Sequence, residues 1–123
     1  MRVLITGATG FVGTALTEQV SSLYDTIVLI RTQNNALSSK IQQLVTANIS
    51  EADLPDNLDV IVHLAGRAHI LNEQTTDPLS EFRKVNVEGT LQLARQALDK
   101  KVKRFIFMSS IGVNGSITLQ QPF

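Results

Sequence analysis

The chain of 123 residues has no cysteine, no excess of charge of either sign and no long apolar run. Without cysteine it has no disulfide, no thiolate metal site and no cysteine nucleophile, which weakly favours a reducing compartment. Eleven basic and eleven acidic side chains cancel, so no field favours nucleic acid or an anionic membrane as a partner. The first apolar run ends at Thr6, too soon for a signal peptide or a membrane span. We therefore expect a soluble, cytoplasmic protein.

A turn punctuated by glycines follows that first apolar run. Residues 3–13 read VLITGATGFVG, with Gly7, Gly10 and Gly13 between an apolar strand and an amphipathic helix. Glycine permits a tight turn and leaves the backbone amides open to a pyrophosphate, toward which the helix points its free N–H groups. The alternative is an ordinary strand-to-helix turn that uses glycine for geometry alone. The flanking strand and helix favour dinucleotide binding.

Strand and helix patterns alternate through residues 1–123, which predicts one α/β domain with a doubly wound parallel sheet. Apolar or β-branched runs predict strands at 2–6, 27–30, 44–47, 58–65 and 102–109. Helical spacing predicts helices over 11–23 and 79–100, the second capped by Asp77 and Pro78, with a helical turn at 40–43 and a turn within 50–57. Residues 66–77 and 110–123 are expected to form loops. A chain reversal after the third strand gives the strand order 3-2-1-4-5, with a ligand at the carboxyl ends of strands 1 and 4.

Each predicted helix has an apolar face. The face of helix 11–23 comprises Phe11, Val12, Ala15, Leu16, Val20 and Leu23. The face of helix 79–100 comprises Phe82, Val85, Gly89, Leu93 and Ala97, widened by Leu91, Ala94 and Leu98. A face this broad predicts contact on two sides, with the sheet and with a second partner.

Four motifs, in this order, resemble the extended short-chain dehydrogenase/reductase family, which includes UDP-galactose 4-epimerase and other nucleotide-sugar epimerases, dehydratases and reductases. They are TGATGFVG at 6–13, VHLAG at 62–66, NVEGT at 86–90 and MSSIGVNG at 108–115. The corresponding family patterns are TGxxGxxG, HLAA, NVxGT and SSxxVYG, and Asn114 replaces the tyrosine of the last. The resemblance implies a Rossmann-like fold, and within the family it is nearest to bacterial enzymes that process UDP-linked sugars for surface polysaccharide.

The resemblance also implies roles for individual residues at the cofactor. Gly7, Gly10 and Gly13 would shape the pyrophosphate turn, with backbone amides from Phe11 and Val12, and Leu64, Ala65 and Gly66 would lie under the adenosine ribose and phosphates. Asn48 would hydrogen-bond the adenine amino group, or is simply a polar strand end. Asn86 would brace the helix near the nicotinamide.

Ser110 matches the family's catalytic hydroxyl, which orients the substrate oxygen while a tyrosine, assisted by a lysine, moves the proton. Ser109, beside it, is assigned to the cofactor site, and a plain strand-end hydroxyl is the alternative for both serines. The Tyr-x-x-x-Lys pair of the family lies further along than Phe123, and the single tyrosine here, Tyr24, is elsewhere. We therefore expect the chain to be the N-terminal, cofactor-binding part of a longer enzyme, truncated before the later strands and inactive alone.

Arg31 follows the second predicted strand, where the family usually has an acidic residue for the ribose of NAD. A guanidinium can pair with the 2′-phosphate of NADP through charge-assisted hydrogen bonds. NADP is therefore favoured, with NAD possible.

His63 and His69 have no third ligand at a recognisable spacing, so no metal site is predicted and His63 is expected to be a core histidine. Two alternatives to an enzyme stay open: a dinucleotide-sensing or regulatory protein of the same fold, and a half-domain without binding. Tyr-x-x-x-Lys in the continuing reading frame would distinguish the enzyme from the sensor. The broad apolar face of helix 79–100 is part of a helix-pair dimer contact in the family, and if it is exposed we expect a homodimer or a larger species.

Overall fold

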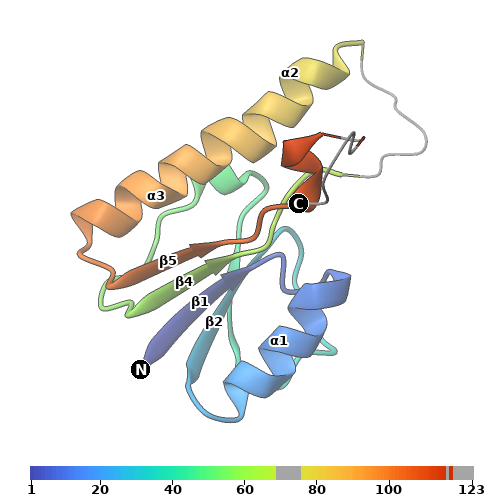
Figure 1. The fold of residues 1–123 in the computed structure, drawn as a ribbon. Coiled ribbons are helices and arrows are strands. Elements are labelled where there is room, and N and C mark those ends of the chain that lie inside the picture. The colour runs from blue at the N-terminus through green and yellow to red at the C-terminus, as the bar shows by residue number, and fades with distance from the viewer. Residues whose placement is uncertain (69–75, 116, 118–123) are drawn as a thin grey trace.

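The computed structural model describes residues 1–68, 76–115 and 117, so His69 lies outside the described residues. A parallel sheet runs in the order β3-β2-β1-β4-β5 (Figure 1). Its strands are β1 (Arg2–Thr6), β2 (Asp25–Ile30), β3 (Gln42–Val45), β4 (Val60–His63) and β5 (Arg104–Phe107). The order confirms the predicted Rossmann-like topology. Because the chain reverses after β3, β1 and β4 are neighbours, with Thr6 beside His63 in register.

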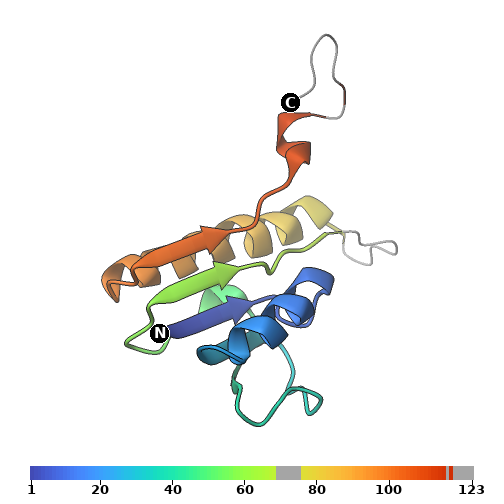
Figure 2. The same cartoon turned by 60° about the horizontal axis from the view of Figure 1, so that its bottom comes forward.

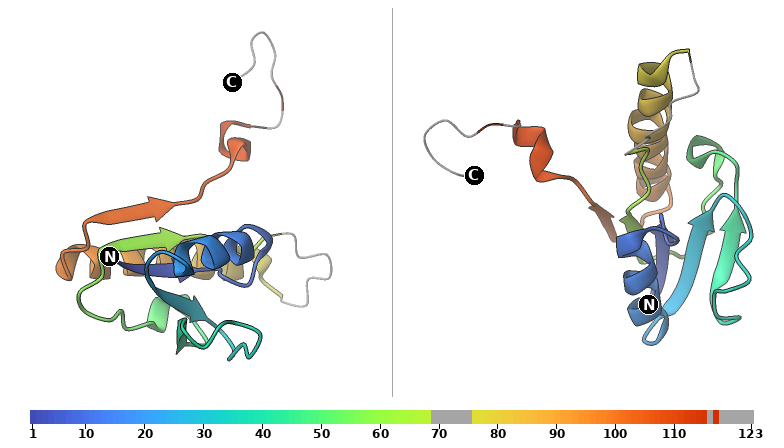
Figure 3. Two further views of the ribbon diagram at one scale, coloured as in Figure 1. Left: turned by 90° about the horizontal axis from the view of Figure 1, so that it is seen from below. Right: turned by 90° about the vertical axis from the view of Figure 1, so that its right-hand side faces the viewer.

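Helices cover both faces of this sheet. On one face lies α1 (Phe11–Ser21), and on the other lies one long rod made of α2 (Pro78–Arg83), η2 (Lys84–Gly89) and α3 (Thr90–Asp99) (Figures 1 and 3). The η2 segment is a π-helical turn. Asp77 caps the rod as predicted, since its Oδ1 accepts from Ser80 N at 3.1 Å and Pro78 occupies the first turn. Among the described residues, no helix has the length and apolar character to cross a membrane.

Two apolar clusters lie on the two faces of the sheet. The cluster under the long rod is formed by Leu4, Ile27, Leu29, Ala52, Leu54, Leu58, Ile61, Leu93 and Ala97. The cluster under α1 is formed by Val3, Ile5, Ala8, Val28, Ile30, Ile41 and Val62. Gly89, Leu93 and Ala97 of the predicted rod face are buried, whereas Leu91 and Leu98 are exposed.

The predicted helical turn at 40–43 is wrong, because Gln42 and Gln43 begin β3. Both side chains are held by tertiary hydrogen bonds: Gln42 accepts from Arg2 Nη2 at 3.1 Å, and Gln43 exchanges two bonds of 2.9 Å with the backbone of Asn34. These long-range bonds override the local pattern. The short η1 helix (Ile49–Glu51) agrees with the turn expected there, and 110–123, expected as loop, contains the short η3 helix (Ile111–Asn114).

The predicted apolar face of helix 11–23 is only partly correct. Leu16 and Val20 pack on the core, but the buried residues of α1 are Gly13 and Thr17. Phe11 is 98% exposed, and Val12, Ala15 and Leu23 are exposed as well. The reason is the close approach of the helix to the glycine turn, which turns the face containing Gly13 inward.

Candidate functional site

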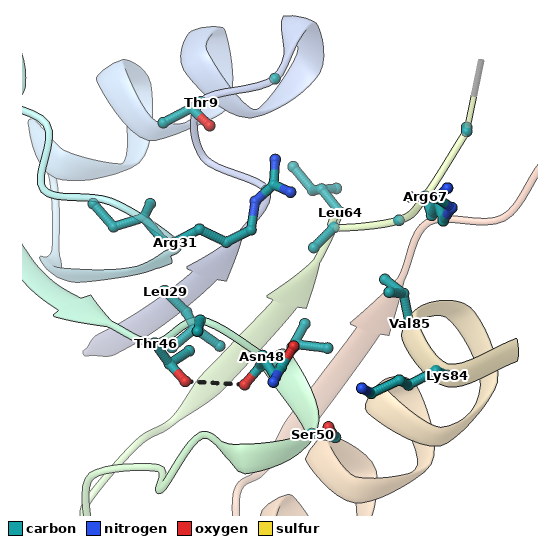
Figure 4. Close-up of a pocket in the computed structure, with 18 of the residues that line it drawn as sticks. Thr9, Leu29, Arg31, Thr46, Asn48, Ser50, Leu64, Arg67, Lys84 and Val85 are labelled. Carbon is teal, nitrogen blue, oxygen red and sulfur yellow. Dashed lines mark hydrogen bonds between the residues drawn. The ribbon is translucent and has the colours of Figure 1, made fainter. Parts of the chain in front are cut away.

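A pocket of about 510 Å³ opens at the carboxyl ends of the central strands (Figure 4). The glycine turn after β1 and the loop after β4 form its floor, the ends of β2 and β3 form one wall, and the rod α2–η2 forms the other. A pocket at the point where strand order reverses is the common ligand site of open α/β sheets. The predicted position of the ligand therefore coincides with a cavity.

The pocket brings together many of the predicted site residues, which come from four separate segments. Its lining includes Gly7, Gly10, Arg31, Asn48, Leu64, Ala65 and Gly66. Six other predicted residues, all among the described ones, lie outside this lining: Phe11, Val12, Gly13, Asn86, Ser109 and Ser110.

The three glycines of the turn differ in how strictly the backbone requires glycine. Gly7 has φ +70°, and a Cβ there would lie 2.7 Å from Ala65 N. A Cβ at Gly13 would lie 2.0 Å from Gly7 O, so the contact between turn and helix needs glycine there. Gly10 has ordinary extended backbone (φ −80°, ψ 174°), and within the described part of the chain a Cβ there would approach Gly7 O alone, at 3.3 Å. The fold thus requires Gly7 and Gly13 but requires Gly10 much less.

Gly10 is also the N-cap of α1. Its own N–H donates to Gly7 O at 3.0 Å, and the first intrahelical bond runs from Thr14 N to Gly10 O at 2.9 Å. The N–H groups of Phe11, Val12 and Gly13 precede that bond and point out of the helix end, where the helix dipole favours an anion. Because Gly10 has no side chain, its own backbone and this helix end are open to the pocket.

Asn86 acts on the pocket through the loop after β4. Its Oδ1 accepts from Arg67 N at 2.7 Å, and its Nδ2 donates to Arg67 O at 2.9 Å. One side-chain amide therefore satisfies both backbone groups of Arg67, a residue that lines the pocket. The π-helical turn carries Asn86, and such turns occur mostly where a helix is locally adapted to a site.

Polar side chains line the two walls. Arg31 extends from the end of β2 toward Thr9 and Leu64, and Lys84 points from the opposite wall toward Asn48 (Figure 4). Asn48 donates through Nδ2 to Glu51 at 2.8 Å, and its backbone oxygen accepts from Thr46 Oγ1 at 2.9 Å. Asn48 lies three residues after the end of β3, at the N-cap position of η1, and it lines the pocket.

Several lining residues were not predicted from the sequence. The polar ones are Thr9, Thr46, Ser50, Arg67, Glu81 and Lys84. Glu81, Lys84 and Val85 follow helical spacing along the rod, and this spacing could have indicated them once the rod was known to face the turn.

His63 is buried as predicted, with 1% exposure. Its Nδ1 lies 2.7 Å from Thr6 Oγ1, and its Nε2 lies 2.8 Å from Thr90 Oγ1. Burial lowers the pKa of the imidazole, which keeps the ring neutral at pH 7. The ring also stacks on Phe107, with 5.6 Å between centroids.

The two serines lie after β5, and η3 extends beyond the sheet from there (Figures 2 and 3). Both side chains are exposed. Ser110 caps η3, because its Oγ accepts from Gly112 N at 3.1 Å. Its own hydroxyl proton is not used by that bond. Tyr24 directly precedes β2 and so lies at the opposite, amino edge of the sheet.

Comparisons with known proteins agree with this geometry. The family model described as the NAD dependent epimerase/dehydratase family matches residues 3–122. A UDP-glucose 4-epimerase of Vibrio cholerae is 44% identical over 121 residues, covering 95% of this chain and 37% of the relative.

Two solved structures share the fold. A UDP-galactose 4-epimerase has a TM-score of 0.76 at 25% identity, covering 94% of this chain and 40% of the other. A UDP-glucuronic acid 4-epimerase from Bacillus cereus, in complex with NAD, has a TM-score of 0.79 at 24% identity, covering 96% and 43%. The chain therefore spans about two fifths of the length of these proteins.

Proposed function

Because the chain belongs to the NAD-dependent epimerase/dehydratase family, we propose that it is the cofactor-binding part of an enzyme that epimerises, dehydrates or reduces a nucleotide sugar. In that enzyme a hydride moves between the sugar and the nicotinamide. The observation that carries the proposal is Gly10, which lines the pocket although the fold itself requires glycine there much less than at Gly7 or Gly13. A ligand that must approach the backbone closely would explain why residue 10 is a glycine.

The pocket residues suit a dinucleotide in one orientation. The pyrophosphate would lie on the turn at Gly10, against the amides of Phe11 and Val12, where the dipole of α1 favours its charge. Leu64, Ala65 and Gly66 would form the floor under the ribose and phosphates. The adenine would lie toward Asn48, and the nicotinamide toward Ser110.

Arg31 supports a preference for NADP over NAD. It lines the pocket and extends from the end of β2, the strand whose end contacts the adenosine ribose in dinucleotide-binding folds. A 2′-phosphate there would accept charge-assisted bonds from the guanidinium, whereas a carboxylate would repel it.

Ser110 would orient the substrate oxygen in the longer protein. Its Oγ already accepts from Gly112 N, and this bond leaves its hydroxyl proton available to a substrate oxygen. Proton transfer would fall to a tyrosine and a lysine outside this chain, because Tyr24 lies at the far edge of the sheet. The chain would then bind the dinucleotide without catalysing the reaction.

The test is to incubate the chain with NAD or NADP and UDP-glucose, and to follow both dinucleotide binding and formation of a new sugar nucleotide by chromatography. Binding without turnover is expected. Turnover by this chain would contradict the assignment of proton transfer to residues outside it. The same assay on the longer protein, which would also contain Tyr-x-x-x-Lys and the part that binds the sugar nucleotide, should give product, and product should be lost in its Ser110→Ala variant.

We also propose a homodimer through the rod. Its solvent side carries a stripe of apolar side chains, namely Leu79 (59% exposed), Val87 (50%), Leu91 (48%) and Leu98 (78%). The same stripe on a second copy can pack against it in a self-complementary, twofold contact. Light scattering should give a dimer or a larger species, and Leu91→Glu should shift it toward the monomer. A monomeric mass at high concentration would contradict the dimer.

A further inference from the structure

A chain of buried and partly buried hydrogen bonds joins Ala65, just after β4, to the rod. Ala65 N lies 3.1 Å from Thr6 Oγ1, which lies 2.7 Å from His63 Nδ1. His63 Nε2 lies 2.8 Å from Thr90 Oγ1, and Thr90 Oγ1 lies 2.8 Å from Asn86 O. Thr6 is 0% and His63 1% exposed. We call these five residues the relay.

The direction of every bond in the relay follows from its two ends. Ala65 N–H can only donate, and the oxygen of Asn86 can only accept. The single hydroxyl proton of Thr90 goes to Asn86 O, so the oxygen of Thr90 must accept from His63 Nε2–H. In a neutral ring Nδ1 then bears no proton, and it accepts the hydroxyl proton of Thr6.

The opposite tautomer does not fit. With the proton on Nδ1, the bare Nε2 would face a hydroxyl whose proton is committed to Asn86 O. Thr6 would also receive two donors, from Ala65 and from His63, and its own proton would need another acceptor. An imidazolium would create the same conflict at Thr6, in a site where burial already disfavours the charge.

The relay connects the two sides of the pocket. At one end, Ala65 lines the pocket floor. At the other end, Asn86 holds both backbone groups of Arg67 with its side chain, as described above. Residues 65 and 67, just after β4, are thus anchored to β1 and to the rod respectively, and His63 connects the two anchors through Thr6 and Thr90.

We propose that His63, in its Nε2–H form, is a positioning residue that fixes residues 64–67, which follow β4, through Thr6 and Thr90. The effect on a dinucleotide rests on the proposed function, whereas the tautomer and the order of the loop do not. Because a buried donor without an acceptor is costly, removal of one hydroxyl should loosen both anchors.

The tautomer is tested first, in the unmodified chain. Two-bond 15N–1H correlation spectra at pH 7.5 distinguish a protonated from a bare ring nitrogen, and His69→Gln assigns the remaining signal to His63. A protonated Nε2 with a bare Nδ1 is expected. A protonated Nδ1, or an imidazolium, would overturn the proposal without reference to any cofactor.

The positioning role is tested with Thr90→Val, which removes the acceptor of Nε2–H, and with Thr90→Ser as the control that keeps the hydroxyl. Amide hydrogen exchange at Ala65 and Arg67 is expected to become about tenfold faster in the valine variant and to stay unchanged in the serine variant. The dissociation constant for NADPH should rise about tenfold in the valine variant alone.

The possible outcomes separate the two proposals. Faster exchange in Thr90→Val with no dinucleotide binding by any form supports the relay and contradicts the proposed function. Binding by the parent chain, with exchange and affinity unchanged in Thr90→Val, contradicts the relay and leaves the proposed function standing. Equal effects of the serine and valine substitutions would show that the hydroxyl is not what matters, and would also overturn the relay.

Discussion

Gly10→Ala tests whether the glycine is required for dinucleotide binding and not for the stability of the fold. The residue has φ −80° and ψ 174°, which alanine adopts without strain. Its new Cβ would lie 3.3 Å from Gly7 O, a close contact that costs some stability because the turn must shift slightly to accommodate it. At a compatible position, replacing glycine by alanine stabilises a protein by about 0.4–1 kcal/mol through the unfolded chain. These effects oppose each other, so the free energy of unfolding should stay within about 1 kcal/mol of the parent.

Dinucleotide binding by the same variant should weaken strongly. The methyl group would occupy the space beside the helix end through which a pyrophosphate reaches the backbone amides. A charge-assisted hydrogen bond contributes about 1.5–3 kcal/mol, so the loss of one bond raises the dissociation constant about ten- to a hundredfold. Urea denaturation measures the first quantity, and calorimetric titration with NADPH measures the second.

Gly13→Ala is the matched comparison. Its Cβ would lie 2.0 Å from the backbone oxygen of Gly7, and no side-chain rotation relieves a clash with backbone. The better helix propensity of alanine stabilises the folded chain by about 1 kcal/mol, whereas overpacking destabilises it by about 1–3 kcal/mol and occasionally more. We expect a clear loss of stability. A Gly10→Ala variant that binds like the parent, or that is destabilised as much as Gly13→Ala, would refute the distinction between the two glycines.

Three further predictions concern other residues. Arg31→Asp should reverse the order of affinities for NADPH and NADH in titration, because it replaces a partner of the 2′-phosphate by one that repels it; equal affinities in the parent chain would remove this reasoning. Asn86→Asp keeps the acceptor for Arg67 N but loses the donor to Arg67 O. The rate of hydrogen exchange at the Arg67 amide should therefore rise, and an unchanged rate would contradict the role of Asn86 in holding Arg67. Burial lowers the pKa of His63 in the folded chain, so the unfolded chain binds the proton more tightly. The contribution of His63 to the free energy of unfolding should therefore be complete above about pH 6.5 and decrease as the pH falls below it. Urea denaturation at pH 5 and 7.5 should show a smaller loss of stability at the lower pH for His63→Gln than for the parent.

The sheet was predictable because buried parallel strands carry a strong pattern. The apolar run at 2–6 and the run containing Ile27 to Ile30 match β1 and β2 closely. The third strand was misplaced because Gln42 and Gln43 look like surface residues, and their partners, Arg2 and Asn34, lie far away or in a loop. Local pattern cannot anticipate hydrogen bonds between distant segments.

The site was predictable in its floor and less so in its walls. The glycines and segment 64–66 could be predicted from their sequence motifs, because the backbone itself forms the surface of the pocket there. Lys84 and Glu81 were missed, since charged residues on a helix usually face solvent. Only the approach of the rod to the glycine turn directs this part of the helix into the pocket. The partners of His63 were also missed, because Thr90 lies 27 residues further along the chain and only the folded structure brings the two together.

The most direct test of a dinucleotide site at the glycine turn is a titration of the 15N-labelled chain with NADPH, followed by amide chemical shifts. Saturable shifts should concentrate at Gly10, Phe11 and Ala65, and they should stay far from saturation when Gly10→Ala is titrated over the same range. Shifts elsewhere on the chain, or no saturable shift at all, would contradict the site.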